Sequence, residues 1–421
     1  MNVILFVCFI ILIIGLFTNF KKTVLVYAPF KLFFIKSVVL ISDISFDGII
    51  SLVVLLIYFF KSSNMKKSKE PFPLYFSFFL LATSIYTFCN IPDLHIKSFI
   101  FQLTPTLGFL FVLFKIISGV RDLKIVISSL TVFVLAMLVN AFVEFLAGVN
   151  FLGELVQSFS IKNAFFATGE NLREGMHRTQ SFFPHSIVFG SICSILLYFY
   201  CFLYIHYQKT KINLLIIIGL MIGVIISMSR TPLLSMIIFL IPIFLSKQLI
   251  KRAGIPVLLL ATIAFCFLYD YIYSMVNSIF ADSGADLQGS SMDLRIQQLE
   301  YTLFLISRNP FLGIGISFDL EKHSEFLYGA ESIWFILLIG KGIWGVITYL
   351  SLYIEIILKS LKNKYFIYIL FLCLGWLLAN SASNMSGMDD YCFLLLFIML
   401  YKLGYYSSLN ERLLVMSSMI K

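Results

Sequence analysis

Apolar runs of about 20 residues, the length that crosses the hydrocarbon core of a membrane as one helix, recur along almost the whole chain. Such runs constrain the fold because backbone polar groups inside a bilayer must be satisfied within the segment itself, as they are in a helix. We therefore predict an all-α polytopic membrane protein with about 12 transmembrane helices, forming a single integral membrane domain over residues 1–421. The predicted spans are 3–19, 44–60, 73–90, 98–118, 125–147, 185–206, 212–228, 232–246, 255–277, 332–357, 365–380 and 389–406.

A further apolar stretch, residues 24–42, contains Lys31 and Lys36. A lysine at the centre of a bilayer costs about 2.5–3.5 kcal/mol on the insertion scale. We therefore predict that this stretch is interfacial, and the choice between 12 and 13 spans depends on it.

The charge content excludes several classes of protein. Only 13% of the residues are charged, about half of what a soluble protein carries. The seven cysteines are scattered without the paired spacing of a metal site or a disulfide framework. Phosphate-binding glycine motifs do not occur either, which argues against an ATP-driven pump. We predict no metal, no cofactor and no nucleic-acid partner.

The net charge of +9 is interpreted as a topology signal. With the N-terminus in the cytoplasm, the inner loops contain about 17 Lys and Arg in about 53 residues, and the outer segments about 12 in about 133. We therefore predict a multi-pass protein of the cytoplasmic membrane with both termini cytoplasmic. Two long loops, residues 148–184 and 278–331, then lie outside, and long loops tend to carry function.

The second long loop contains a predicted amphipathic helix. Asp293 can cap it, and Asn309-Pro310 ends it, because the residue before a proline disfavours the helical region. Apolar side chains recur at helical spacing at Ile296, Leu299, Leu303 and Ile306. We interpret the segment as a helix that lies on the membrane or forms a lid.

Three arginines recur at the predicted outer boundary. They are Arg178, Arg230 and Arg295. A guanidinium is always charged and binds phosphate bidentately, so the three suit a membrane-attached anion such as a lipid pyrophosphate. The alternative is that they reach the headgroup region without a function. Arg230 is the strongest case, because its loop is too short to need a charge for solubility.

Other ionisable residues on this face are candidates for acid and base roles. Glu331, at the start of a predicted span, is a candidate general base or a partner of an arginine, or else an interfacial acid favoured by the helix dipole. His185 and His323 are candidate acids or bases that contact the substrate. Lys341 lies within a predicted span, where we expect a structural or cavity role, and the neighbouring glycines would let another helix approach closely.

Four segments together resemble the O-antigen ligase and O-antigen polymerase superfamily of bacterial envelope glycan enzymes. One is Arg178 followed by SFFPHSIVFG, and the next is SRTPLL at 229–234. The third is Arg295 with RNPFLGIG at 308–315. The fourth is Glu331-Ser332 followed by GIWG at 342–345. Ligases of this group usually carry His-Asn where this chain has Glu331-Ser332, so the start of this helix is more similar to that of the polymerases.

The resemblance implies polymerisation of oligosaccharide repeat units carried on polyprenyl pyrophosphate, at the outer face of the bacterial cytoplasmic membrane. It implies O-antigen, capsule or another exopolysaccharide as product. The bilayer, a flippase and a chain-length regulator are the implied partners. Arg230, Arg295 and Glu331 would be catalytic, and Arg178, His185 and His323 would bind the pyrophosphate or the glycan.

Two alternatives remain open. A ligase would transfer the finished glycan to a lipid or protein acceptor, with the same arginines and with His323 as base. A transporter or flippase would do no chemistry, and it would show midplane binding groups and broken helices in two matching halves.

Overall fold

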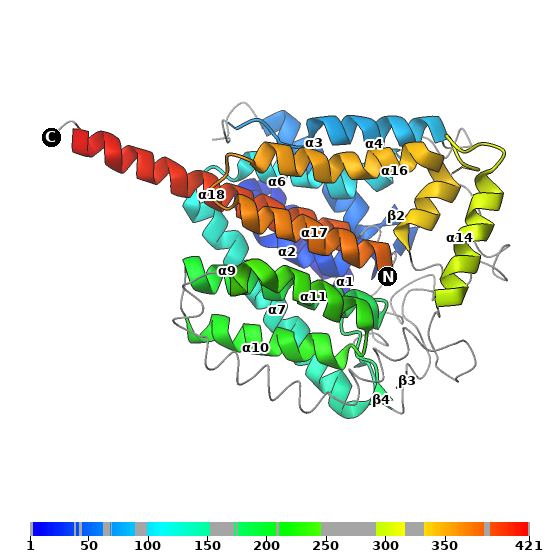
Figure 1. Cartoon of the computed structure of the whole chain (residues 1–421). Coiled ribbons are helices and arrows are strands. Elements are labelled where there is room, and N and C mark those ends of the chain that lie inside the picture. The colour runs from blue at the N-terminus through cyan, green and yellow to red at the C-terminus, as the bar shows by residue number, and fades with distance from the viewer. Residues whose placement is uncertain are drawn as a thin grey trace.

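The computed structural model describes residues 3–37, 39–41, 44–61, 68, 70–88, 99–151, 172–173, 176–207, 210–245, 292–315, 332–382 and 388–419. These residues form thirteen α-helices, one π-helix and two short antiparallel strand pairs (Figure 1), which confirms the all-helical class. Within the same residues, four helices are long and apolar enough to cross a membrane: α7, α9, α16 and residues 390–408 of α18.

Each described helix other than α2 and α14 overlaps a predicted span. The predicted span 255–277 lies outside the described residues. The first half of the chain contains α1 (Val3–Thr18), α2 (Phe20–Ser37), α3 (Phe46–Lys61), α4 (Tyr75–Phe88), the π-helix η2 (Phe99–Gly108), α6 (Phe109–Ile116) and α7 (Val120–Ala147). The second half contains α9 (Ser186–His206), α10 (Lys211–Ile226), α11 (Arg230–Phe244), α14 (Met292–Ile306), α16 (Ile333–Ser360), α17 (Phe366–Ala382) and α18 (Met388–Met419). Strand β1 (Val39–Ile41) pairs with β2 (Ile44–Ser45), and β3 (Leu172–Arg173) pairs with β4 (Met176–His177).

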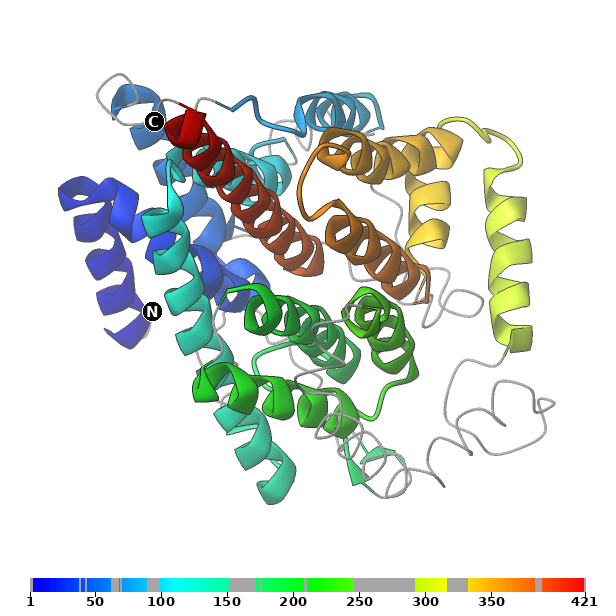
Figure 2. The ribbon, with the colours of Figure 1, turned by 60° about the vertical axis from the view of Figure 1, so that its left-hand side comes forward.

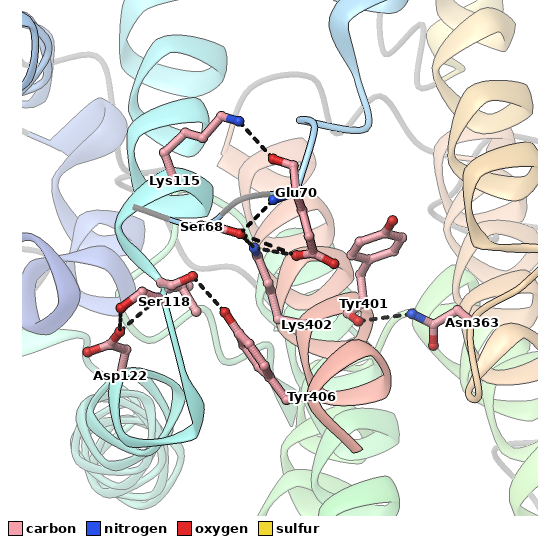
Figure 3. A network of polar contacts seen from close by, with 10 residues as sticks. Ser68, Glu70, Lys115, Ser118, Asp122, Asn363, Tyr401, Lys402 and Tyr406 are labelled. Atoms are coloured by element: carbon pink, nitrogen blue, oxygen red, sulfur yellow. Dashed lines mark hydrogen bonds and ion pairs between the residues drawn. The ribbon is translucent and has the colours of Figure 1, made fainter. Parts of the chain in front are cut away.

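One end of the helix bundle is fastened by a polar network around Lys402 (Figure 3). The Lys402 ammonium donates to Ser68 Oγ at 2.7 Å and to Glu70 Oε2 at 2.6 Å. Lys115 Nζ donates to the carbonyl of Glu70 at 2.8 Å, and Tyr406 Oη donates to the carbonyl of Ile117 at 3.0 Å. These contacts join the segment before α4, the end of α6 and α18, and we call this region the Lys402 end.

Helix α2 lies inside the bundle and not at its edge. It packs against α1, α3, α7 and α18, and its Lys31 is fully buried. The ammonium forms an ion pair with the buried Asp47 of α3 and donates to Ser51 Oγ at 2.9 Å, while Tyr27 Oη donates to Asp47 Oδ1 at 3.0 Å. The prediction that residues 24–42 are interfacial is therefore wrong, because it counted the cost of a lone lysine and did not include the carboxylate that neutralises it.

The direction of α1 follows from that of α2. Lys21, at the start of α2, pairs with Asp122 at 2.7 Å, and Lys61 donates to the carbonyl of Phe17 at 3.1 Å. The turn between α1 and α2 therefore lies at the Lys402 end, and α1 begins at the other end. The C-terminus projects beyond the Lys402 end, and the N-terminus lies at the other end of α1 (Figure 1). The placement of both termini in the cytoplasm stays a prediction, and the course of α1 argues against it. That prediction did not count α2 among the helices of the bundle.

We expect reporters at the two termini to appear on opposite sides of the membrane. In the fold, Lys21 and Lys22 lie at the Lys402 end and add to its positive charge. Loops rich in Lys and Arg stay in the cytoplasm. An N-terminal alkaline phosphatase should be active and a C-terminal fluorescent protein should fluoresce. A phosphatase fused after Lys22 is the control and should be inactive. Two termini that report from the same side would contradict the course of α1.

Candidate functional site

Two connections between helices meet at the end of the bundle opposite Lys402. One is the segment from Arg178 that leads into α9, and the other is the turn between α10 and α11 (Figure 1). The amide of Thr179 donates to the carbonyl of Ile226 at 3.2 Å. Arg178 Nη2 donates to Ser229 Oγ at 2.9 Å, and this hydroxyl donates to the carbonyl of Ser227 at 3.0 Å. Since Arg230 directly follows Ser229 in the sequence, the Arg178 side chain contacts the residue next to a second predicted site arginine. We call this region the Arg178 end.

A buried carboxylate holds the Arg178 segment in place. Glu144, near the end of α7, accepts from the amides of Gln180 at 2.9 Å and Ser181 at 2.7 Å. Its other contact is His177 Nε2 at 3.2 Å. Glu144 was not among the predicted site residues, although an acidic residue inside an apolar run is itself a sign of a functional or structural partner.

Ser181 is kept in an unusual backbone conformation, with a φ of 51°. Such a conformation in a residue other than glycine persists when its surroundings fix it. Ser181 Oγ donates to the carbonyl of Met137 at 2.8 Å, and Asn150 Nδ2 donates to the carbonyl of Ser181 at 2.8 Å. The segment that presents Arg178 is therefore fixed from both sides.

His185 caps the start of α9. Its Nδ1 accepts from the amide of Ile187 at 3.1 Å, so the neutral ring carries its proton on Nε2. Burial, and to a smaller extent the charge of Arg178, lowers the pKa of His185 to about 4. The ring is therefore neutral at pH 7 and offers one N–H donor, while its other nitrogen serves the helix.

Further polar atoms are buried close to Arg178 in the sequence. Thr179 Oγ1, Gln180 Oε1 and Ser186 Oγ have no hydrogen-bond partner among the described residues, and all three side chains are buried. Buried oxygens of this kind are uncommon in folded proteins. They add hydroxyl and amide groups to the region that Arg178 and Arg230 occupy.

Helix α16 is broken where the glycines lie. Gly342 has φ 61° and ψ −156°, which interrupts the helix. The turn at 310–314 fills the break: Ile343 N donates to Pro310 O at 2.9 Å, Trp344 N to Phe311 O at 3.2 Å, and Ile314 N to Ile339 O at 2.7 Å. The third and fourth resembling segments thus meet through their backbones.

Side chains would prevent this contact. A Cβ on Gly313 would lie 2.5 Å from Ile339 O, and a Cβ on Gly342 would lie 2.5 Å from Pro310 O. Another helix was predicted to approach the glycines next to Lys341, and at Gly342 it is the 310–314 turn that makes the close approach. Because the turn bonds to the amides of Ile343 and Trp344 and to the carbonyl of Ile339, these three groups are not open to a transported solute.

Polar contacts join the start of α16 to α17, the middle of α16 to α17, and α17 to α18. Trp334 Nε1 donates to Ser381 Oγ at 2.8 Å, and Asn380 Nδ2 donates to Tyr349 Oη at 2.6 Å. Trp376 Nε1 donates to Asp390 Oδ1 at 3.3 Å. The helix that follows Glu331 therefore starts from a fixed position at the Arg178 end.

The six predicted site residues have different outcomes. Arg178, His185 and Arg230 lie together at the Arg178 end. Arg295 lies in the first turns of α14, which packs against α16, and helical spacing puts position 295 on the same side as Gln298 and Thr302. Glu331 and His323 lie outside the described residues, as does most of the two long loops. Within the described residues, no group of three or more His, Cys, Asp or Glu is placed to hold a metal ion.

The apolar helices and the buried charges between them define an integral membrane protein. Residues 213–350 match a family model described as O-antigen ligase, a family of glycosyltransferase-like enzymes. The match is consistent with the O-antigen ligase and polymerase superfamily and confirms the resemblance read from the motifs. It covers the positions of Arg230, Arg295 and Glu331, while Arg178 and His185 precede it. No curated protein matches the chain.

Proposed function

We propose that the protein polymerises lipid-linked oligosaccharide repeat units into O-antigen, capsule or exopolysaccharide at the outer face of the bacterial cytoplasmic membrane. The observation that carries the proposal is the contact of Arg178 with Ser229, next to Arg230. It joins a segment outside the family match to a segment inside it. Two guanidinium groups at one end of an apolar bundle suit the charge of a pyrophosphate on a lipid.

The proposed reaction transfers a glycan from polyprenyl pyrophosphate to an acceptor sugar. The acceptor hydroxyl oxygen attacks the anomeric carbon, and the bond from that carbon to the pyrophosphate oxygen breaks. The electron pair leaves with the lipid pyrophosphate, where Arg178, Arg230 and Arg295 stabilise the developing charge. Glu331 takes the hydroxyl proton or orients an arginine.

Neutral polar groups would orient the sugars. The Nε2–H of His185 is a donor next to the Arg178 segment, and the oxygens of Thr179, Gln180 and Ser186 lie in the same stretch. Hydroxyl-rich substrates need such groups at fixed positions. A flippase that delivers the lipid-linked unit and a chain-length regulator are the partners that this reaction would use.

The description of the matched family favours a second candidate function, that of a ligase. A ligase would transfer the finished glycan to a lipid or protein acceptor, with the same arginines and with His323 as base. The Glu331-Ser332 start of α16, in place of His-Asn, favours the polymerase.

The variant Glu331→Gln distinguishes the polymerase from the ligase in a host whose own copy of the gene is deleted. If Glu331 is the general base, polymer should fall at least about 100-fold, leaving single repeat units on the lipid carrier on a glycan gel. The matched control is Glu300→Gln, at an exposed position of α14, which should keep long chains. Long chains that accumulate on the carrier would instead indicate a ligase, and unchanged surface polymer would leave Glu331 as a helix cap.

A further inference from the structure

Helix α14 has three differently composed sides. Gln298 and Thr302 are buried, and Gln298 is 1% exposed. Ile296, Leu299 and Leu303 are exposed, and Leu303 is 50% exposed. Gln297 and Glu300 are also exposed, and so is Phe304, at 70%. The side that faces the protein is thus partly polar, while apolar side chains point away from it, which is the reverse of a helix at a boundary between protein and water.

This arrangement decides between the two interpretations of the predicted amphipathic helix. As a lid, α14 would press its apolar residues onto the protein. Of the four apolar residues at helical spacing, Ile306 is buried, whereas Ile296, Leu299 and Leu303 are exposed. These three residues form what we call the α14 strip.

Exposed apolar side chains continue from α14 to a helix that can span the membrane. The turn after α14 exposes Phe311, Leu312 and Ile314 and is hydrogen-bonded to α16. Helix α16 is one of the candidate membrane spans. It exposes apolar side chains of its own at Ile343, Trp344, Ile347, Ile354 and Leu358. The apolar surface of a membrane-spanning helix therefore extends through the turn towards α14.

The direction of α14 also fits the surface of a membrane. Both ribbon views show α14 at the Arg178 end of the bundle, beside the part of α16 that precedes the break at Gly342 and steeply inclined to α17 and to the rest of α16 (Figures 1 and 2). A helix that lies in the membrane interface has an apolar side in the hydrocarbon boundary and a polar side in water. The α14 strip supplies the apolar side, and the exposed Gln297 and Glu300 lie beside it, with the exposed Phe304 between them.

We infer that α14 is a membrane-surface helix whose strip of Ile296, Leu299 and Leu303 is inserted among the acyl chains of the leaflet at the Arg178 end. The occupant of this surface is bilayer lipid. The inference does not depend on any transfer reaction. If α14 lies at the membrane surface, then position 295 in the same helix lies at the depth of the lipid headgroups.

Site-directed fluorescence in lipid nanodiscs tests the inference. In a cysteine-free background, a single environment-sensitive label is attached at Leu303→Cys or, as the matched control, at Gln297→Cys. Both positions are exposed on the same helix. We expect the label at 303 to emit at shorter wavelength and to be quenched several-fold more by doxyl-labelled lipids than by aqueous iodide, and the label at 297 to show the reverse.

Two outcomes would overturn the inference. Iodide quenching at 303 equal to that at 297 would place the strip in water. Protection of 303 from both quenchers would show that it is covered by protein. Repeating the measurement with Arg230→Ala separates the inference from the proposed function, because loss of glycan transfer should leave the quenching pattern unchanged.

Discussion

Replacing Arg230 with alanine is expected to reduce polymer formation at least about 100-fold, the effect of removing one preorganised group that stabilises developing charge. Arg230 starts α11 directly after Ser229, the serine that Arg178 contacts. The backbone that carries the Arg230 side chain is therefore held in place at the first residue of α11. Loss of this cation should leave single repeat units on the lipid carrier, which a gel of the extracted glycans would show.

Two further variants show whether the effect of Arg230→Ala comes from the lost charge, from the lost donor geometry or from a general effect of removing an arginine. Arg230→Lys keeps a positive charge but loses the planar fork of donors, so we expect activity between that of the wild type and that of Arg230→Ala. Arg121→Ala removes an exposed arginine near the Lys402 end and should leave the chain-length pattern unchanged. Membrane levels of each variant are measured by immunoblot. Normal long chains from Arg230→Ala at normal protein level would refute a role for this arginine in the transfer.

Most of the helices could be predicted because a membrane makes the length of an apolar run informative. Helices α7, α9, α10 and α11 begin and end within a few residues of their predicted bounds. The interpretation of residues 24–42 was wrong because the cost of a buried lysine depends on its partner. Asp47 lies 16 positions away in the sequence, and nothing in the local pattern of α2 indicates it.

The sequence was enough to predict which residue types form the candidate site, but not which of these residues lie next to each other. The sequence indicated Arg178 and Arg230 separately, while the contact of Arg178 with Ser229, the residue before Arg230, exists only because two connections between helices meet in the fold. Glu144 was missed because it lies within an apolar run, although its carboxylate accepts two amides from the Arg178 segment. The backbone contact between the turn at Gly313 and the break at Gly342 was also missed, because it forms only in the folded chain.

The buried pair Lys31–Asp47 provides the largest expected effect on stability. Asp47→Asn removes the negative charge and leaves the Lys31 ammonium inside the bundle, next to the rings of Phe109 and Tyr391. Breaking a buried ion pair from one side costs about 3–5 kcal/mol. We expect the free energy of unfolding in detergent, measured by denaturant titration, to fall by about that amount.

The double variant Lys31→Met/Asp47→Leu distinguishes an unpaired charge from poor packing. Replacing both partners with apolar residues removes the cost of burying charge, so stability should return to within about 1–2 kcal/mol of the wild type. The matched control is Asp122→Asn, whose partner Lys21 is 31% exposed, and such a pair contributes about 0–1 kcal/mol. If Asp47→Asn costs no more than this control, then Lys31 does not depend on the carboxylate, and the explanation for the burial of α2 fails.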